Sequence, residues 1–195
     1  MKLPIVAYGD PILRKKTEEI DENYEGLSDL IANMFDTMYA ARGVGLAAPQ
    51  IGLAIRLFVV DATPYSESDD EEEGDPSLKN FKKVFINPIM VEEKDEKVGE
   101  IEGCLSIPDI SEEVDRPLSI VINYLNENFE EIEEEYSGMA ARIIQHEFDH
   151  IEGKLFVDKL SPLKKAMLKS KLDAISKGKI SVPYRMRFPN FKKGR

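Results

Sequence analysis

The two histidines of this chain lie four residues apart in the segment QHEFDH (145–150). On a helix, this spacing places His146 and His150 on the same face, one turn apart, where both rings can reach one metal ion. Glu147 lies on the same side and can exchange a proton with a water molecule on that metal. The alternative is a chance match on an amphipathic helix. We favour a metal site because the chain has no other histidine.

Two imidazoles leave a catalytic metal short of a protein ligand, and the downstream sequence offers few candidates. In the longer peptidase motif, the position of the third histidine is occupied here by Phe156. Asp173 is the only acid beyond Asp158, so the peptidase pattern with a more distant glutamate also fails. Glu152 is too close to His150 to turn back easily onto the same metal. Asp158 remains a weak candidate.

Cys104, the only cysteine, is the stronger candidate for the third ligand. It ends a strand-like run in the segment EGCLSIP (102–108). Considered alone, a single cysteine is more often a small apolar core residue. Combined with His146 and His150, it completes three protein ligands and leaves one tetrahedral position open, as in catalytic rather than structural zinc sites.

An open metal position indicates hydrolysis, because a divalent metal brings the pKa of bound water close to neutrality. Glu147 could accept the proton of that water and deliver it to a departing amine. The reaction also needs donors for a developing oxyanion. Candidates are the side-chain amide of Gln50, in GVGLAAPQIG (43–52), and the backbone N–H of Leu105. Considered alone, a Gly- and Pro-rich segment such as 43–52 is more often a simple turn after a helix than part of an active site.

Helices and strands that could position these residues are predicted from the hydrophobic pattern. Apolar residues at three-and-four spacing predict helices over 24–42, 138–152 and 162–176. We expect Ser137 to cap the second helix, and Gly43 and Gly153 to end the first two. A hairpin turn is predicted at 126–128. Short β-branched or apolar runs predict strands within 55–62, 83–93, 97–107, 117–125 and 128–138.

Composition indicates one globular domain over residues 1–195, with 42% apolar and 32% charged residues. No apolar run approaches the ~20 residues of a membrane span, and the N-terminus lacks the apolar region of a secretory signal. A single cysteine excludes an intrachain disulfide. We therefore expect a cytoplasmic protein without a membrane partner.

Charge is distributed unevenly around a net value of −11. Residues 64–80 include five consecutive acids, which predicts a solvated surface insertion. Residues 159–195 form a basic helix and tail with 12 Lys and Arg against one acid, so this segment carries +11 and the remainder −22. Two interpretations of this segment remain open. Its charges could simply keep the chain end solvated while the end packs on the protein, or the segment could dock on ribosomal RNA.

The segments GVGLAAPQIG, EGCLSIP and QHEFDH together closely resemble the three motifs of peptide deformylases, in the same order. The similarity runs from YGDPILRK to KLSPLKK and so covers most of the chain. It implies an α+β fold, with antiparallel β-sheets packed around a central HExxH-bearing helix and with an N-terminal and a C-terminal helix. It also implies that metal-activated water removes the formyl group from the N-terminal formyl-methionine of newly synthesised polypeptides.

The resemblance also implies roles for individual residues. One divalent metal ion per chain would be bound by Cys104, His146 and His150. Glu147 would be the general acid and base, and the oxyanion would be held by Gln50 and the Leu105 N–H. Substrate contacts would come from Val44, Gly45, Gly103, Met139 and Ile143, with the glycines along the backbone and the apolar residues around the methionine side chain.

The expected physiological ion is Fe²⁺, which the family commonly uses, although the donor set also suits Zn²⁺, Ni²⁺ or Co²⁺. The insertion 64–80 and the acidic segment DISEEVDRP after EGCLSIP depart from the compact family pattern. Two other functions compete: an ordinary metallopeptidase, which would lack its downstream ligand, and a non-catalytic metal-binding or ribosome-associated protein, which would have no use for Glu147.

Overall fold

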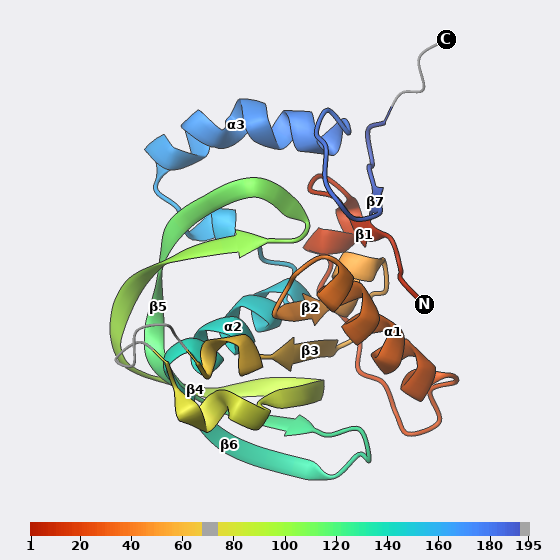
Figure 1. The fold of residues 1–195 in the computed structure, drawn as a ribbon, viewed down its shortest axis with the longest axis vertical. Coiled ribbons are helices and arrows are strands. Elements are labelled where there is room, and N and C mark those ends of the chain that lie inside the picture. Colours follow the sequence, from red (N-terminus) through yellow and green to blue (C-terminus); the bar gives the residue numbers. More distant parts are fainter. Residues whose placement is uncertain (68–73, 192–195) are drawn as a thin grey trace.

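The computed structural model describes residues 1–67 and 74–191. Within these residues the fold is α+β, as predicted (Figure 1). Three α-helices are present: α1 (Leu27–Ala40), α2 (Gly138–Ile151) and α3 (Pro162–Ser176). The β-strands are β1 (Ile5–Val6), β2 (Gly45–Ala47), β3 (Leu57–Asp61), β4 (Lys82–Cys104), β5 (Ile107–Leu125), β6 (Glu131–Ser137) and β7 (Met186–Arg187).

The strands form two sheets of different kinds. Five strands pair antiparallel in the order β2-β3-β4-β5-β6, while β1 and β7 form a separate parallel pair. The expectation of antiparallel sheets is therefore correct for the large sheet and wrong for the small one. Two-residue strands from opposite ends of the chain are too short to leave an alternating pattern in the sequence.

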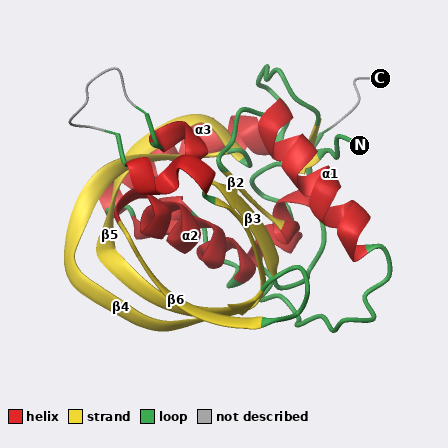
Figure 2. Cartoon of the chain, turned by 60° about the horizontal axis from the view of Figure 1, so that its bottom comes forward, coloured by secondary structure: helices red, strands yellow, loops and turns green. Residues whose placement is uncertain are grey.

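The long strands β4 and β5 differ from the shorter runs that the sequence predicts. The predicted run 83–93 and residues 97–104 of the next run belong to one strand, β4, whose charged middle lies at the surface. The predicted run 97–107 extends past the end of β4 through the turn to Ile107, where β5 begins. Its pairing with β5 contains four register shifts, and such bulges bend a strand. Both strands curve around α2, so the sheet encloses this helix on one side (Figure 2).

Helix α2 is buried because its apolar residues pack on the concave face of the sheet. Ala141 and Ile144 are fully buried in a cluster with Phe58 and Phe85 of the sheet. The predicted range 138–152 agrees with the observed helix to within one residue. Ser137 stands at the N-cap position, but its side chain makes no capping hydrogen bond.

The segment after α1 departs from its prediction in two ways. The residue with left-handed backbone is Arg42, at φ 59°, and not Gly43. The segment 43–52, predicted as a loop, contains β2 and a 3-10 helix (Ala48–Ile51). Strand β2 forms because it pairs with β3, a contact that the local sequence does not encode.

The acidic insertion 64–80 is more ordered at its ends than the sequence predicts. Short 3-10 helices occupy Thr63–Tyr65 and Pro76–Asn80, and Leu78 is buried in the core around α2. Leu78 is the exception to the predicted solvated segment, because the other residues of 74–80 are exposed or half-buried. The five consecutive acids all lie within 68–73, outside the described residues.

Much of the basic C-terminal segment packs against the body of the protein. Helix α3 has the predicted bounds, 162–176. The chain then returns to β1, where the N–H groups of Ile5 and Ala7 donate to the carbonyls of Arg185 and Arg187, at 2.8 and 2.9 Å. Across the described residues, no helix combines the length and apolar character needed to cross a membrane.

Candidate active site

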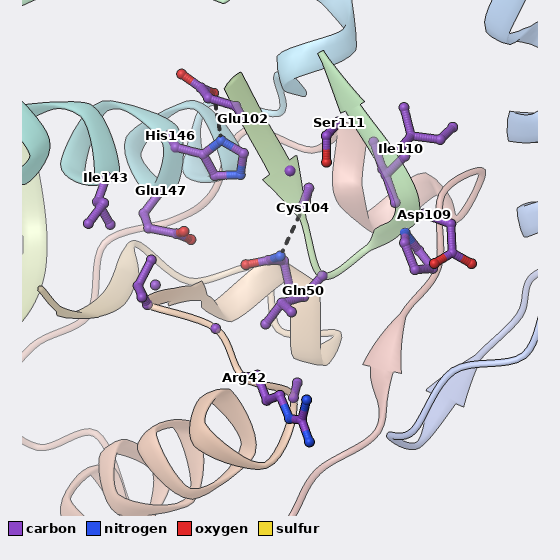
Figure 3. A pocket seen from close by; sticks show the side chains of 18 of the residues that line it. Arg42, Gln50, Glu102, Cys104, Asp109, Ile110, Ser111, Ile143, His146 and Glu147 are labelled. Atoms are coloured by element: carbon purple, nitrogen blue, oxygen red, sulfur yellow. Dashed lines mark hydrogen bonds and ion pairs between the residues drawn. The ribbon is translucent and has the colours of Figure 1, made fainter. Parts of the chain in front are cut away.

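A cavity of about 430 Å³ lies between α2, the end of β4 and the segment after α1 (Figure 3). Every site residue predicted from the sequence except His150 lines this cavity. They come from three separate parts of the chain: Val44, Gly45, Gln50; Gly103, Cys104, Leu105; and Met139, Ile143, His146, Glu147. The fold therefore brings the three motif segments together around one space.

Three potential metal ligands meet at the wall of the cavity. One donor atom from each of Cys104, His146 and His150 lies within 4.8 Å of the others. Sγ of Cys104 is 3.3 Å from Nε2 of His150, which is buried just behind the cavity lining. A sulfur and two imidazole nitrogens at this separation suit a tetrahedral or similar divalent ion, so these residues fit the expected metal.

Glu102 orients the first histidine of the motif. Nδ1 of His146 lies 3.0 Å from the Glu102 carboxylate, which leaves Nε2 of the ring for a metal. Burial raises the pKa of Glu102, but hydrogen bonds from His146 and Arg116 outweigh this effect and lower the pKa to about 2. Glu102 is therefore ionised at neutral pH and fixes which nitrogen of His146 carries the proton.

Two buried arginines hold Glu102 in place. Arg116 donates to both of its carboxylate oxygens, at 2.6 and 2.9 Å, and Arg142 donates to one of them at 2.8 Å. Arg116 also donates to Asp149 of α2 at 2.8 Å. Strands β4 and β5 and helix α2 are thus joined by charged hydrogen bonds directly behind the candidate metal ligands.

The two histidines differ in electrostatic environment. Burial and the positive charges of His146 and Arg116 hold the pKa of His150 well below its usual value, so this ring is neutral. Burial also lowers the pKa of His146, but its hydrogen bonds to Cys104 and Glu102 outweigh this effect and raise the pKa to about 10. Metal binding would therefore release a proton from this site.

Glu147 is buried, and its side chain projects from α2 towards Gln50 (Figure 3). Its Oε2 atom has no hydrogen-bond partner among the described residues. Burial raises the pKa of Glu147 to about 7, despite the opposing charges of His146 and Arg116. A carboxyl group with this pKa can both accept and donate a proton near neutral pH.

Gly45 is required by the position of Glu147. A Cβ atom on Gly45 would overlap the Glu147 carboxylate, so any other residue would displace it or shift β2. Across the cavity, Gln50 is almost fully buried and is fixed by the Ala47 N–H, which donates to its Oε1 at 2.8 Å. Its Nε2 is left facing Cys104, at 3.6 Å from Sγ.

Comparison with known proteins shows which family the chain belongs to. The family model for polypeptide deformylase matches residues 2–166. The chain belongs to the polypeptide deformylase family. The peptide deformylase of Christiangramia forsetii is 57% identical over 196 residues, and the match covers the full length of both chains. That of Flavobacterium johnsoniae is 52% identical over 198 residues, again with complete coverage of both chains.

Solved deformylase structures share the fold. The crystal structure of a peptide deformylase from Legionella pneumophila is 39% identical, with a TM-score of 0.78, and the match covers 92% of this chain and 98% of that one. As a member of the deformylase family, the chain is a hydrolase that removes the formyl group from nascent polypeptides.

Sequence reasoning missed several residues at this candidate site. Glu102 was detectable, because it lies two residues before Cys104 and alternate strand residues share a face. Arg42 and Tyr65 also line the cavity, as does the segment 181–184 from the C-terminal region. These residues belong to no chemical motif and reach the site only through tertiary packing.

Proposed function

We propose that the enzyme removes the formyl group from N-terminal formyl-methionine with one divalent cation, held by Cys104, His146 and His150. The convergence of these three ligands beside Glu147, on the wall of one cavity, is the observation that supports this proposal most directly. Fe²⁺ is the proposed physiological ion, and Zn²⁺, Ni²⁺ or Co²⁺ would suit the same donors. A bound cation would supply Lewis acidity and lower the pKa of water.

In this proposal Glu147 is the general base and then the general acid. Its carboxylate takes a proton from the attacking water and later delivers it to the departing amine. The Gln50 side chain and the Leu105 N–H donate to the oxyanion that develops on the formyl carbonyl. Gln50 is held before substrate binds, because the Ala47 N–H donates to its side-chain oxygen. Leu105 lies next to Cys104 in the two-residue turn between β4 and β5.

The proposed substrate contacts follow the lining of the cavity. Val44, Met139 and Ile143 supply apolar surface for the methionine side chain. Gly45 and Gly103, which have no side chains, let the substrate backbone approach closely. We also propose that residues 1–195 act as one catalytic domain, with the HExxH-bearing helix α2 at its centre.

Formate release from formyl-Met peptides tests the proposed function. We expect anaerobically purified enzyme to release formate, and Glu147→Gln to lose at least ~10²-fold in kcat while retaining its metal. Cleavage of internal peptide bonds would instead support a metallopeptidase. Unchanged metal content in Cys104→Ala would contradict the assignment of the third ligand.

We further propose that the basic segment 159–195 contacts ribosomal RNA. Several of its bases already pair with acids of this protein, including Lys159 with Asp149 and Lys164 with Glu112. Lys169 and Lys171 are exposed on α3 and offer positive charge to an external partner. The double variant Lys169→Glu/Lys171→Glu should reduce co-sedimentation with ribosomes at low salt, because phosphate contacts are electrostatic. Unchanged co-sedimentation would contradict a contact through α3.

A further inference from the structure

The turn that follows Cys104 is held from outside the large sheet. Strands β4 and β5 are joined by only two residues, Leu105 and Ser106, with Cys104 paired to Ile107. The Tyr184 hydroxyl donates to the Leu105 carbonyl at 2.9 Å. The Ser106 carbonyl accepts a hydrogen bond from the Tyr8 N–H at 2.8 Å. Each carbonyl of the turn therefore has its own external donor.

These two donors come from opposite ends of the chain, and the small sheet joins them. Tyr8 lies two residues after β1, and Tyr184 lies two residues before β7. The register of the parallel pair is Ile5 with Met186 and Val6 with Arg187. Figure 1 shows the two terminal strands side by side, next to the end of the β4–β5 hairpin. We call this unit, residues 5–8 with 184–187, the terminal clamp.

Tyr184 lies outside the part of the chain that the family model matches, because that match ends at residue 166. Its ring is half-buried and packs against the same apolar cluster as Leu105. It also lines the active-site cavity, together with residues 181–183. The C-terminal segment is thus a wall of the site as well as a support for the turn.

We propose that Tyr184, acting within the terminal clamp, is a positioning residue for the oxyanion donor. The proposal rests on the proposed function, in which the Leu105 N–H binds the oxyanion. Cys104 is fixed by its pairing with Ile107, and the Tyr184 hydroxyl fixes the carbonyl on the other side of Leu105. With both neighbouring peptide groups held, the Leu105 N–H keeps one orientation before substrate arrives, as electrostatic preorganisation requires.

The test compares Tyr184→Phe with Tyr24→Phe in the full-length, metal-loaded enzyme. Tyr24 packs against the same apolar cluster but does not line the cavity, so it is a matched control for loss of a hydroxyl. We expect Tyr184→Phe to lower kcat for a formyl-Met peptide about fivefold, since a neutral hydrogen bond contributes roughly that factor. KM and metal content should stay close to the parental values, and Tyr24→Phe should match the parent in all three.

Amide hydrogen exchange of residues 104–106 gives a second measurement that needs no activity. Tyr184→Phe should exchange faster there than the parent and Tyr24→Phe. Faster exchange with unchanged kcat would mean that the clamp is only structural, and unchanged exchange would mean that Tyr184 does not hold the turn. Either result overturns the proposal. If the parental enzyme releases no formate, the proposed function fails, whereas the exchange experiment still tests the clamp.

Discussion

Two walls of the candidate active-site cavity are built by different means. The helix wall consists of Met139, Ile143, His146 and Glu147 on α2, with His150 buried behind it. The turn wall consists of residues 43–45, Gln50 and residues 103–105. The helix wall is held from behind by buried charged side chains centred on Arg116. The turn wall depends instead on backbone hydrogen bonds and on the absence of side chains at glycines.

Because of this difference, mutations that affect the two walls should have different effects. A charged network joins several elements at once, so loss of one member should destabilise the whole fold. A close-packed turn affects few neighbours, so a small change there should impair catalysis and leave the stability largely intact.

Removing the central charge of the network behind the helix wall should have the largest effect. Arg116→Met removes two buried hydrogen bonds to Glu102 and leaves Asp149 with only its ion pair to Lys159. We expect it to reduce the free energy of unfolding by about 3–5 kcal/mol, because a broken buried ion pair leaves an uncompensated charge. Urea denaturation measures this loss. A decrease close to zero would mean that the network does not hold the helix wall.

Acidic pH should destabilise the fold through the same charged network, because Glu102 becomes protonated. Its pKa in the folded protein, about 2, lies below the ordinary value of 4.5, so its ionised form stabilises the fold above pH 4.5. This contribution, about 3 kcal/mol at most, should be lost as the pH falls from 4.5 towards 2. Glu102→Gln should lack this part of the pH dependence. Denaturation in the presence of a chelator excludes effects of metal release, and identical pH profiles for the two proteins would contradict the assignment.

A smaller and purely catalytic effect is expected in the turn wall. Gly45→Ala places a methyl group against the Glu147 carboxylate. We expect kcat to fall about 10- to 100-fold, because displacement of a catalytic group by about 1 Å can reduce the rate by such a factor. The control is Gly99→Ala, whose added methyl meets the movable ends of Glu113 and Asp115 on β5. Equal activity of both variants would show that Gly45 does not fix Glu147.

The smallest effect should come from an ion pair outside both walls. Lys94 pairs with Glu135 at 2.9 Å on the exposed part of the sheet. Lys94→Ala should leave both the urea midpoint and kcat unchanged within error, because exposed ion pairs contribute little. A shift comparable to that of Arg116→Met would remove the distinction between the buried network and ordinary surface charge.

Local sequence determined much of this protein. The bounds of α2 and α3 follow from periodicity, which acts over a few neighbouring positions. Turn-forming residues placed the hairpin turn at 126–128, and the observed connection is longer, at 126–130. The side-by-side placement of His146 and His150 follows from the helix alone. The residues of the three motif segments and their order along the chain were sufficient to indicate the deformylase family.

Tertiary structure decided what periodicity does not encode. The approach of Cys104 to His150, the overlap that excludes a side chain at Gly45, and the pairing of β1 with β7 all join residues distant in sequence. The approach of Cys104 to His150 joins the end of β4 to α2, around which β4 and β5 bend. The spacing of the two histidines was therefore set by the sequence of one helix, whereas the distance to the third ligand was set by the packing of the whole sheet.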